Sequence, residues 1–131
     1  MGIGENSKGK LSNAKTILVA EDNDLSYMYL EIVLNNAGYN VLHARNGQEA
    51  VDLCVEYPEI CLALIDIKMP IMNGLDAAIK IKKLRADLPV VAQTAYALLS
   101  DKKLFDNYGF DEYITKPIRK DYLIEVVKKY I

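Results

Sequence analysis

ICLALIDIKMPIMNG, residues 60–74, contains a strand, a loop and the first turn of a helix. Its first six residues form a continuous apolar run, which is typical of a strand buried on both faces of a parallel sheet. The run ends at Asp66, and Asn73 can cap a helix from Leu75 to about Arg85. The stretch therefore predicts a strand, a loop and a helix, with a carboxylate where the strand ends.

The same alternation of strands and helices continues on both sides of this stretch. Further strands are predicted at residues 16–20, 39–43, 89–93 and 111–115. Further helices are predicted at residues 25–37, 48–57, 98–108 and 120–130. Five strands that alternate with five helices indicate a doubly wound α/β domain with a parallel sheet.

The first predicted helix has a regular apolar pattern. Its spacing is helical, and Gly38 is placed to end it; the repeating positions are Leu25, Met28, Tyr29, Ile32, Val33, Asn36 and Ala37. We therefore expect an amphipathic helix that begins just after the first strand.

The bulk properties indicate one domain of ordinary globular composition. The chain has 131 residues and a net charge of -2, which gives it no general attraction for nucleic acid or for anionic membranes. Residues 1–14 are rich in Gly, Ser, Asn and Lys, so we expect a linker or a tag remnant there and a folded domain at 15–131. Cys54 and Cys61 lie in apolar runs and are expected to be buried thiols in the cytoplasm.

Polar side chains follow four of the five predicted strands. They are Glu21 and Asp22 after the first strand, Asp66 after the third, Thr94 after the fourth and Lys116 after the fifth. Ligands of doubly wound sheets bind at the carboxyl ends of the strands, so these groups are expected to meet. Each one alone has an ordinary structural explanation as a turn, a cap or an exposed loop residue; their coincidence at one edge indicates a site.

The expected charges at this edge favour a metal ion. Two carboxylates about 4 Å apart repel by roughly 4 kcal/mol at an effective dielectric constant of about 20. Lys116 offsets one of three negative charges, so a hard cation such as Mg²⁺ is expected to balance the rest. Carboxylates also act as nucleophiles in aspartyl-phosphate chemistry, and Mg²⁺ supports phosphoryl transfer.

Four segments resemble the receiver domain of two-component response regulators. They are VAEDND (19–24), LALIDIKMPIMNG (62–74), VVAQTAYA (90–97) and DEYITKPI (111–118), and the resemblance extends over residues 15–131. It implies a flavodoxin-like sheet with the strand order 2-1-3-4-5. The segments TAYAL and YITKPI also resemble receivers of hybrid sensor histidine kinases.

The resemblance implies a role for each site residue. Asp66 is the expected phosphoacceptor, Asp22 a direct metal ligand, Glu21 a ligand through water, and Lys68 a ligand through its backbone carbonyl. The remaining expected roles belong to Lys116, to the switch residues Thr94 and Tyr113, to Pro117 in the cis form, and to Gly74.

A switch of this kind has protein partners rather than a substrate that it turns over. The expected partner is a histidine kinase or a histidine phosphotransfer domain. The helix at 98–108, the strand at 111–115 and the last helix form a candidate homodimer face. Lys68 and Tyr96 are expected to flank the phosphoryl group and to slow its hydrolysis, because both are bulky and poor bases near neutral pH.

Two other functions are weighed against this one. A haloacid-dehalogenase phosphatase also uses an aspartate and Mg²⁺, but it needs a second aspartate two residues after the nucleophile, where this chain has Lys68. A flavodoxin-like binding module needs a phosphate loop rich in Ser, Thr and Gly after the first strand, where this chain has EDND. His43, the single histidine, is expected to be an ordinary surface residue rather than a phosphorelay histidine.

Overall fold

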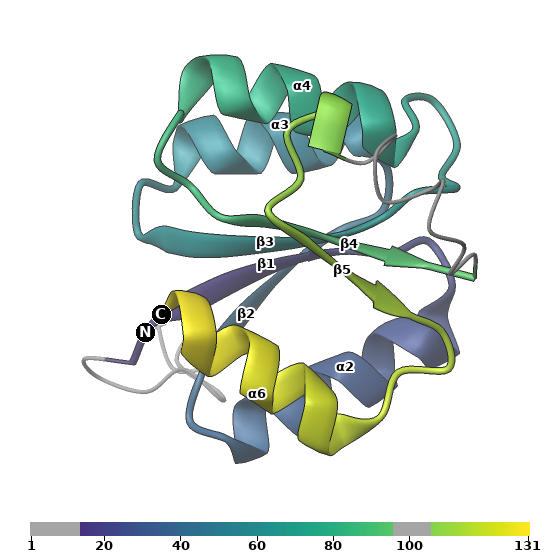
Figure 1. Cartoon of the computed structure of the whole chain (residues 1–131), viewed down its shortest axis with the longest axis vertical. Helices are drawn as coiled ribbons and strands as arrows, with labels where there is room; N and C mark the ends of the chain where they lie inside the picture. The colour runs from purple at the N-terminus through teal and green to yellow at the C-terminus, as the bar shows by residue number, and fades with distance from the viewer. Residues whose placement is uncertain (1–13, 96–105) are drawn as a thin grey trace, which may run out of the picture.

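The sheet consists of five parallel strands in the order β2-β1-β3-β4-β5, as Figure 1 shows for the computed structural model, which describes residues 14–95 and 106–131. The strands are β1 (Thr16–Ala20), β2 (Asn40–Ala44), β3 (Ile60–Asp66), β4 (Val90–Thr94) and β5 (Glu112–Thr115). The predicted fold class and strand order are confirmed.

Helices cover both faces of the sheet. In the described residues these are α2 (Asp24–Asn36), α3 (Gly47–Glu56), α4 (Gly74–Leu84) and α6 (Lys120–Tyr130). Figure 1 shows α3 and α4 on one face, with α2 and α6 on the other. Most of the helix predicted at 98–108 lies outside the described residues, although Asp106 and Asn107 are helical. Residues 1–13 of the expected linker also lie outside them.

Asparagine caps begin three of these helices. The side chains of Asn23, Asn46 and Asn73 each accept a hydrogen bond from the backbone three residues further on. Asn46 and Asn73 are the caps that the sequence predicts. Each cap turns the chain from a strand end or loop into a helix, which fixes the loops at the carboxyl edge of the sheet.

The core is divided into two layers by the sheet. Leu18 and Ala20 face the layer under α3 and α4, whereas Ile17 and Val19 face the layer under α2 and α6. All five residues of β1 are buried. Burial on both faces explains why the sequence of this strand is a continuous apolar run rather than an alternating pattern.

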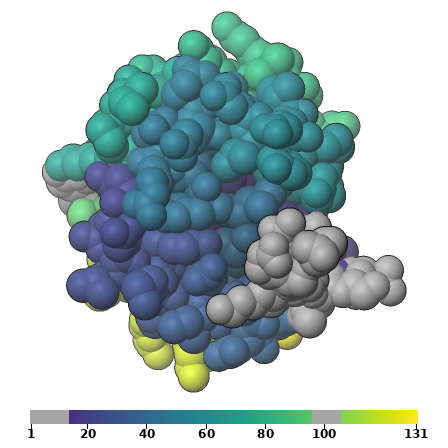
Figure 2. Space-filling model, turned by 180° about the vertical axis from the view of Figure 1, so that it is seen from behind, coloured from purple at the N-terminus to yellow at the C-terminus, as the bar shows by residue number. Residues whose placement is uncertain are grey.

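Helix α2 departs from its expected orientation. Its buried residues are Leu30 and Leu34. Among the predicted apolar positions, Val33 packs partly against the core, whereas most of the others are exposed. The exposed residues Leu25, Met28, Tyr29 and Ile32 keep between 42% and 78% of their surface accessible. In the view from behind (Figure 2), the segment that contains α2, β2 and α3 forms most of the visible surface. We call these four residues the α2 stripe.

The loop after β3 is tied closely to its neighbours. The Gly74 N–H donates to the Ile67 carbonyl at 2.8 Å, and the Gly47 N–H donates to the Met72 carbonyl at 2.9 Å. A Cβ atom at Gly74 would overlap the Asp66 carbonyl, and one at Gly47 would overlap the Met72 carbonyl. Only glycine permits these close approaches, so both residues set the path of the loop beside Asp66.

The two ends of the folded region meet at the opposite edge of the sheet. Lys15 precedes β1, and its Nζ donates to the backbone carbonyl of Ile131 at 2.6 Å. The ends are therefore neighbours on the side away from the strand ends that carry the acidic residues (Figure 1).

Candidate functional site

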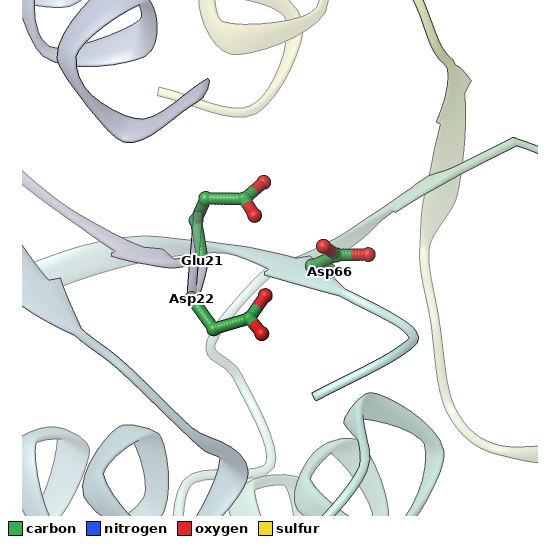
Figure 3. Close-up of side chains that lie close together, drawn as sticks. All are labelled: Glu21, Asp22 and Asp66. Atoms are coloured by element: carbon green, nitrogen blue, oxygen red, sulfur yellow. The ribbon is translucent and has the colours of Figure 1, made fainter. Parts of the chain in front are cut away.

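Three carboxylates meet where β1 and β3 end. Glu21 and Asp22 follow β1, and Asp66 is the last residue of β3, the strand paired with β1. One carboxylate oxygen of each lies within 4.8 Å of the others, and Figure 3 shows Glu21 and Asp22 extending side by side toward the end of β3, where Asp66 lies. The sequence correctly places these residues together.

The three acidic residues differ in their exposure to solvent. Glu21 is 1% exposed and Asp66 is buried, whereas Asp22 is exposed. Backbone N–H groups approach the two buried carboxylates: that of Asn23 lies 3.1 Å from Glu21 Oε2, and that of Lys68 lies 3.4 Å from Asp66 Oδ1. The floor of the site is therefore buried, and one side of the site is open to solvent.

Lys116 supplies a positive charge between the two buried carboxylates. Its Nζ donates to Asp66 Oδ2 at 3.0 Å and to Glu21 Oε1 at 3.3 Å. The bond between Lys116 and Pro117 is cis, as expected, and the Lys116 N–H donates to the Thr94 carbonyl at 2.7 Å. Burial by itself would lower the pKa of Lys116, but the hydrogen bond and charge of Asp66, together with Glu21, raise it above its ordinary value.

Glu21 is held in an environment that disfavours its ionised form. Burial raises its pKa above the ordinary 4.5, and the negative charge of Asp66 raises it further. The hydrogen bond from Asn23 and the charge of Lys116 oppose this shift. The net direction is upward, with burial as the largest cause, so the metal-free site favours the neutral form of Glu21.

The donor set fits a hard divalent cation. Mg²⁺ prefers carboxylate oxygens as ligands, and three of them are clustered here. Mg²⁺ also keeps several water molecules, and the exposed side at Asp22 leaves room for them. Glu21, Asp22 and Asp66 carry three negative charges when ionised, against the single positive charge of Lys116. A divalent cation would supply the charge that is missing.

The other predicted site residues that the structure describes lie on β4, on β5 and in the loop after β3. Thr94 ends β4 and is buried, one position beyond Gln93, which pairs with Asp66. Tyr113 lies half-buried on β5, opposite Ala92. Lys68 is exposed and lines an open hollow together with Asp22, Met69 and Leu75, among others. Tyr96 lies outside the described residues.

Two residues outside the predicted site, His43 and Gln93, also contact the end of β1. His43 is not an ordinary surface residue, because its Nε2 lies 2.8 Å from the Glu21 carbonyl and its ring stacks on Tyr27. Gln93 is buried, and its Nε2 donates to the Ala20 carbonyl at 3.3 Å. The polar residue within the apolar strand 90–94 was a signal for Gln93, whereas the strand pairing that brings in His43 leaves no signal in the sequence.

Comparisons with known proteins agree with this geometry. Residues 17–128 match the family model of the response regulator receiver domain. The polar-differentiation response regulator DivK of Brucella anthropi is 36% identical over 123 residues, which cover 89% of this chain and 96% of DivK. Hybrid signal transduction histidine kinase I of Dictyostelium discoideum is 35% identical over 123 residues, which cover 88% of this chain but only 7% of that kinase.

Solved structures show the same fold. The receiver domain of the Pseudomonas aeruginosa sensor histidine kinase PA1611, solved with a magnesium ion in its active-site cleft, has a TM-score of 0.81 and 27% identity, covering 89% of this chain and 97% of that one. A Saccharomyces cerevisiae complex of the histidine phosphotransfer protein Ypd1 with the Ssk1 receiver domain has a TM-score of 0.84 and 26% identity, covering 92% and 91%.

These matches favour neither the phosphatase nor the flavodoxin-like binding module that we weighed from the sequence. The family match covers most of the chain, and it agrees with the strand order and with the acidic edge of the sheet. The chain belongs to the response regulator receiver domain family and is a signalling domain of the two-component phosphorelay.

Proposed function

We propose that Asp66 accepts a phosphoryl group from a phosphohistidine of a histidine kinase or a phosphotransfer domain. The observation that carries this proposal is the position of Lys116 Nζ, which contacts both Asp66 and Glu21 beside a third carboxylate. The domain then acts as a switch that assists its own phosphorylation and dephosphorylation, rather than as a turnover enzyme.

The residues divide the chemistry among them. Glu21, Asp22, Asp66 and the Lys68 carbonyl would hold Mg²⁺, which when bound neutralises negative charge on the phosphoryl oxygens. An Asp66 carboxylate oxygen forms the new P–O bond while the P–N bond of the phosphohistidine breaks, and its electron pair returns to the imidazole. The Lys116 ammonium and the Thr94 hydroxyl each hold a phosphoryl oxygen.

Labelling with a small phosphodonor tests this assignment. Acetyl phosphate with Mg²⁺ is expected to give one base-labile phosphoryl group per chain, and chelation of the metal is expected to abolish it. Asp66→Asn is expected to remain folded and unlabelled, whereas Asp76→Asn, which alters an exposed aspartate on α4, is the matched control and labels normally. Full labelling of Asp66→Asn would exclude Asp66 as the acceptor.

We further propose that the phosphorelay partner docks on the α2 stripe. Helix α2 begins at Asp24, two residues after Asp22, so the stripe is continuous with the rim of the site that a phosphohistidine must reach. Its four residues follow helical spacing and are exposed, which suits an apolar helix laid along them. The occupant that we assign is a helix of the histidine phosphotransfer domain or of the kinase domain that carries the phosphohistidine.

Transfer from a protein donor separates docking from chemistry. With phosphorylated Ypd1 as the donor, Met28→Lys and Ile32→Lys are expected to slow transfer to Asp66 by about tenfold or more, the loss typical of a central contact residue. Labelling by acetyl phosphate should not change. Val55→Lys is the matched control, because Val55 is 56% exposed on α3, on the opposite face of the sheet. Equal slowing by the control, or none by the stripe variants, would exclude this surface.

We propose that residues 15–131 form the receiver domain and that it works in the cytoplasm, where Cys54 and Cys61 stay free thiols, as they are here. Within residues 14–95 and 106–131, none of the helices has both the length and the apolar character that a membrane crossing needs.

A further inference from the structure

We propose that His43 is a positioning residue that fixes the peptide bond between Glu21 and Asp22 and thereby aims both carboxylates at Asp66. This inference rests on the proposed function, because it concerns the same acidic cluster. The two residues lie just beyond the last strand residue of β1, Ala20, which pairs with Ala44 of β2.

Residues of β2 and β4 hold the peptide groups on both sides of Glu21. The Glu21 N–H donates to the Ala44 carbonyl of β2 at 2.9 Å, and the Ala20 carbonyl accepts from Gln93 of β4 at 3.3 Å. The Glu21 carbonyl lies 2.8 Å from Nε2 of His43. Because a carbonyl oxygen can only accept, Nε2 carries the hydrogen of this bond.

This contact restricts the direction of both acidic side chains. A peptide group is planar, so a bond to the Glu21 carbonyl fixes the plane that joins Glu21 to Asp22. The Glu21 carboxylate has further contacts with Lys116 and Asn23. Asp22 is exposed, so its aim depends more on the backbone that His43 holds.

The imidazole is itself held in place. The ring of Tyr27 stacks on it with centroids 3.5 Å apart and an angle of 5° between the planes. The Tyr27 hydroxyl donates to Glu31 Oε2 at 3.1 Å, which anchors the tyrosine within α2. The bond to the Glu21 carbonyl and the stacking on Tyr27 together define one orientation of the His43 ring. Outer residues that orient metal ligands in this way typically contribute 10- to 100-fold to metal affinity.

Three variants of the full chain separate the hydrogen bond from general packing. His43→Leu removes the donor, His43→Gln keeps an N–H donor, and Val41→Ala loosens the same strand without touching the bond. The Mg²⁺ dissociation constant, the melting temperature and the metal-free amide NMR shifts of Glu21 and Asp22 are measured for each. We expect His43→Leu to raise the dissociation constant about tenfold, whereas the other two stay close to the wild type.

Two results would overturn the proposal. One is a wild-type dissociation constant in His43→Leu, and the other is a loss in Val41→Ala as large as that in His43→Leu. If His43→Leu is poorly folded, the test is the metal-free amide shifts of His43→Gln. The proposal requires the shifts of Glu21 and Asp22 in this variant to stay near those of the wild type, and a large change in them would overturn it. Labelling of Asp66→Asn would overturn the proposed function instead, and it leaves these shifts unaffected.

Discussion

Glu21 is a buried carboxylate whose ionisation costs stability in the metal-free domain. Its folded-state pKa is raised above 4.5, so its contribution to stability is present below that pH and is lost as the pH rises through the folded value. We predict that Glu21→Gln raises the free energy of unfolding in chelator at neutral pH by about 1 kcal/mol, or the melting temperature by about 4 °C. Differential scanning calorimetry measures both.

The matching control is Glu56→Gln, which alters an exposed glutamate at the end of α3 and should leave the melting temperature unchanged. Addition of Mg²⁺ should reverse the order, because binding stabilises the folded wild type more than a variant with a weakened site. A metal-free Glu21→Gln domain less stable than the wild type would contradict the burial argument.

The lifetime of the phosphoryl group depends on the residues around Asp66. Lys68 is exposed beside the hollow that includes Asp22, and Tyr96 lies two positions after Thr94, outside the described residues. We predict slow hydrolysis in the wild type and faster decay in Lys68→Asn with Tyr96→Glu, because smaller and acidic groups admit and orient water. The decay of phospho-Asp66 in Mg²⁺ buffer measures this; decay within seconds in the wild type, or no acceleration in the variant, would contradict shielding.

Charged groups at strand ends made much of the site predictable from the sequence. Glu21, Asp22 and Asp66 follow apolar runs, and Lys116 follows the strand at 112–115. Parallel strands bring such positions to one edge. His43 could not be found in this way. It lies within β2 rather than at a strand end, and only the pairing of β2 with β1 brings its side chain to the Glu21 carbonyl. A hydrogen bond from a side chain to the backbone of another strand leaves no periodic signal.

At the scale of elements, α2 shows the limit of prediction from periodicity. The spacing correctly predicts a helix, but α2 carries apolar residues on two faces. Leu30 and Leu34 face the core, and the equally regular α2 stripe faces solvent. The hydrophobic pattern fixes the period of a helix, whereas the choice of buried face follows from packing against β2 and against the core residues Ile17 and Val19.

The loop between β3 and α4 contains an unusual backbone conformation. Ile71 has a φ of 70° and is 84% exposed, and a left-handed backbone costs a residue with a Cβ atom about 1–2 kcal/mol. We predict that Ile71→Asn raises the free energy of unfolding by about 1 kcal/mol, because asparagine tolerates this conformation better. Chemical denaturation measures the change, with the helical and exposed Ile32→Asn as the control that shows no gain.

At the scale of the molecule, phosphorylation is expected to shift a population between two states. We predict that beryllofluoride with Mg²⁺ changes NMR shifts beyond Asp66, at Thr94 and Tyr113 and along the hollow lined by Tyr122 and Tyr130. Thr94 and Tyr113 lie on neighbouring strands, so movement at one has a short path to the other. Asp66→Asn should show none of these changes, and shifts confined to the surroundings of Asp66 in the wild type would contradict the switch.

The fold of the whole chain was more predictable than its assemblies. Alternating strands and helices indicated the doubly wound sheet, and the strand order came from the receiver resemblance; the structure confirms both. The homodimer face formed by the helix at 98–108, β5 and α6 stays a prediction. The lack of a nucleic-acid partner also stays one, because a net charge of -2 bears only on non-specific attraction. A binding surface is defined by the shape and charge of its partner as well as by its own residues, so the sequence of one chain does not determine it.

The hydrogen bond between Lys15 and Ile131 has a mechanical consequence. Both attachment points sit side by side, on the edge of the sheet away from Asp66 (Figure 1). A longer polypeptide joined there would act as a flexible linker attached at one point, with the reactive edge of the sheet facing away from it. The domain could then rotate as a rigid body and reach a phosphodonor and a phosphoacceptor in turn. The linker length would set the effective concentration of the domain at each partner.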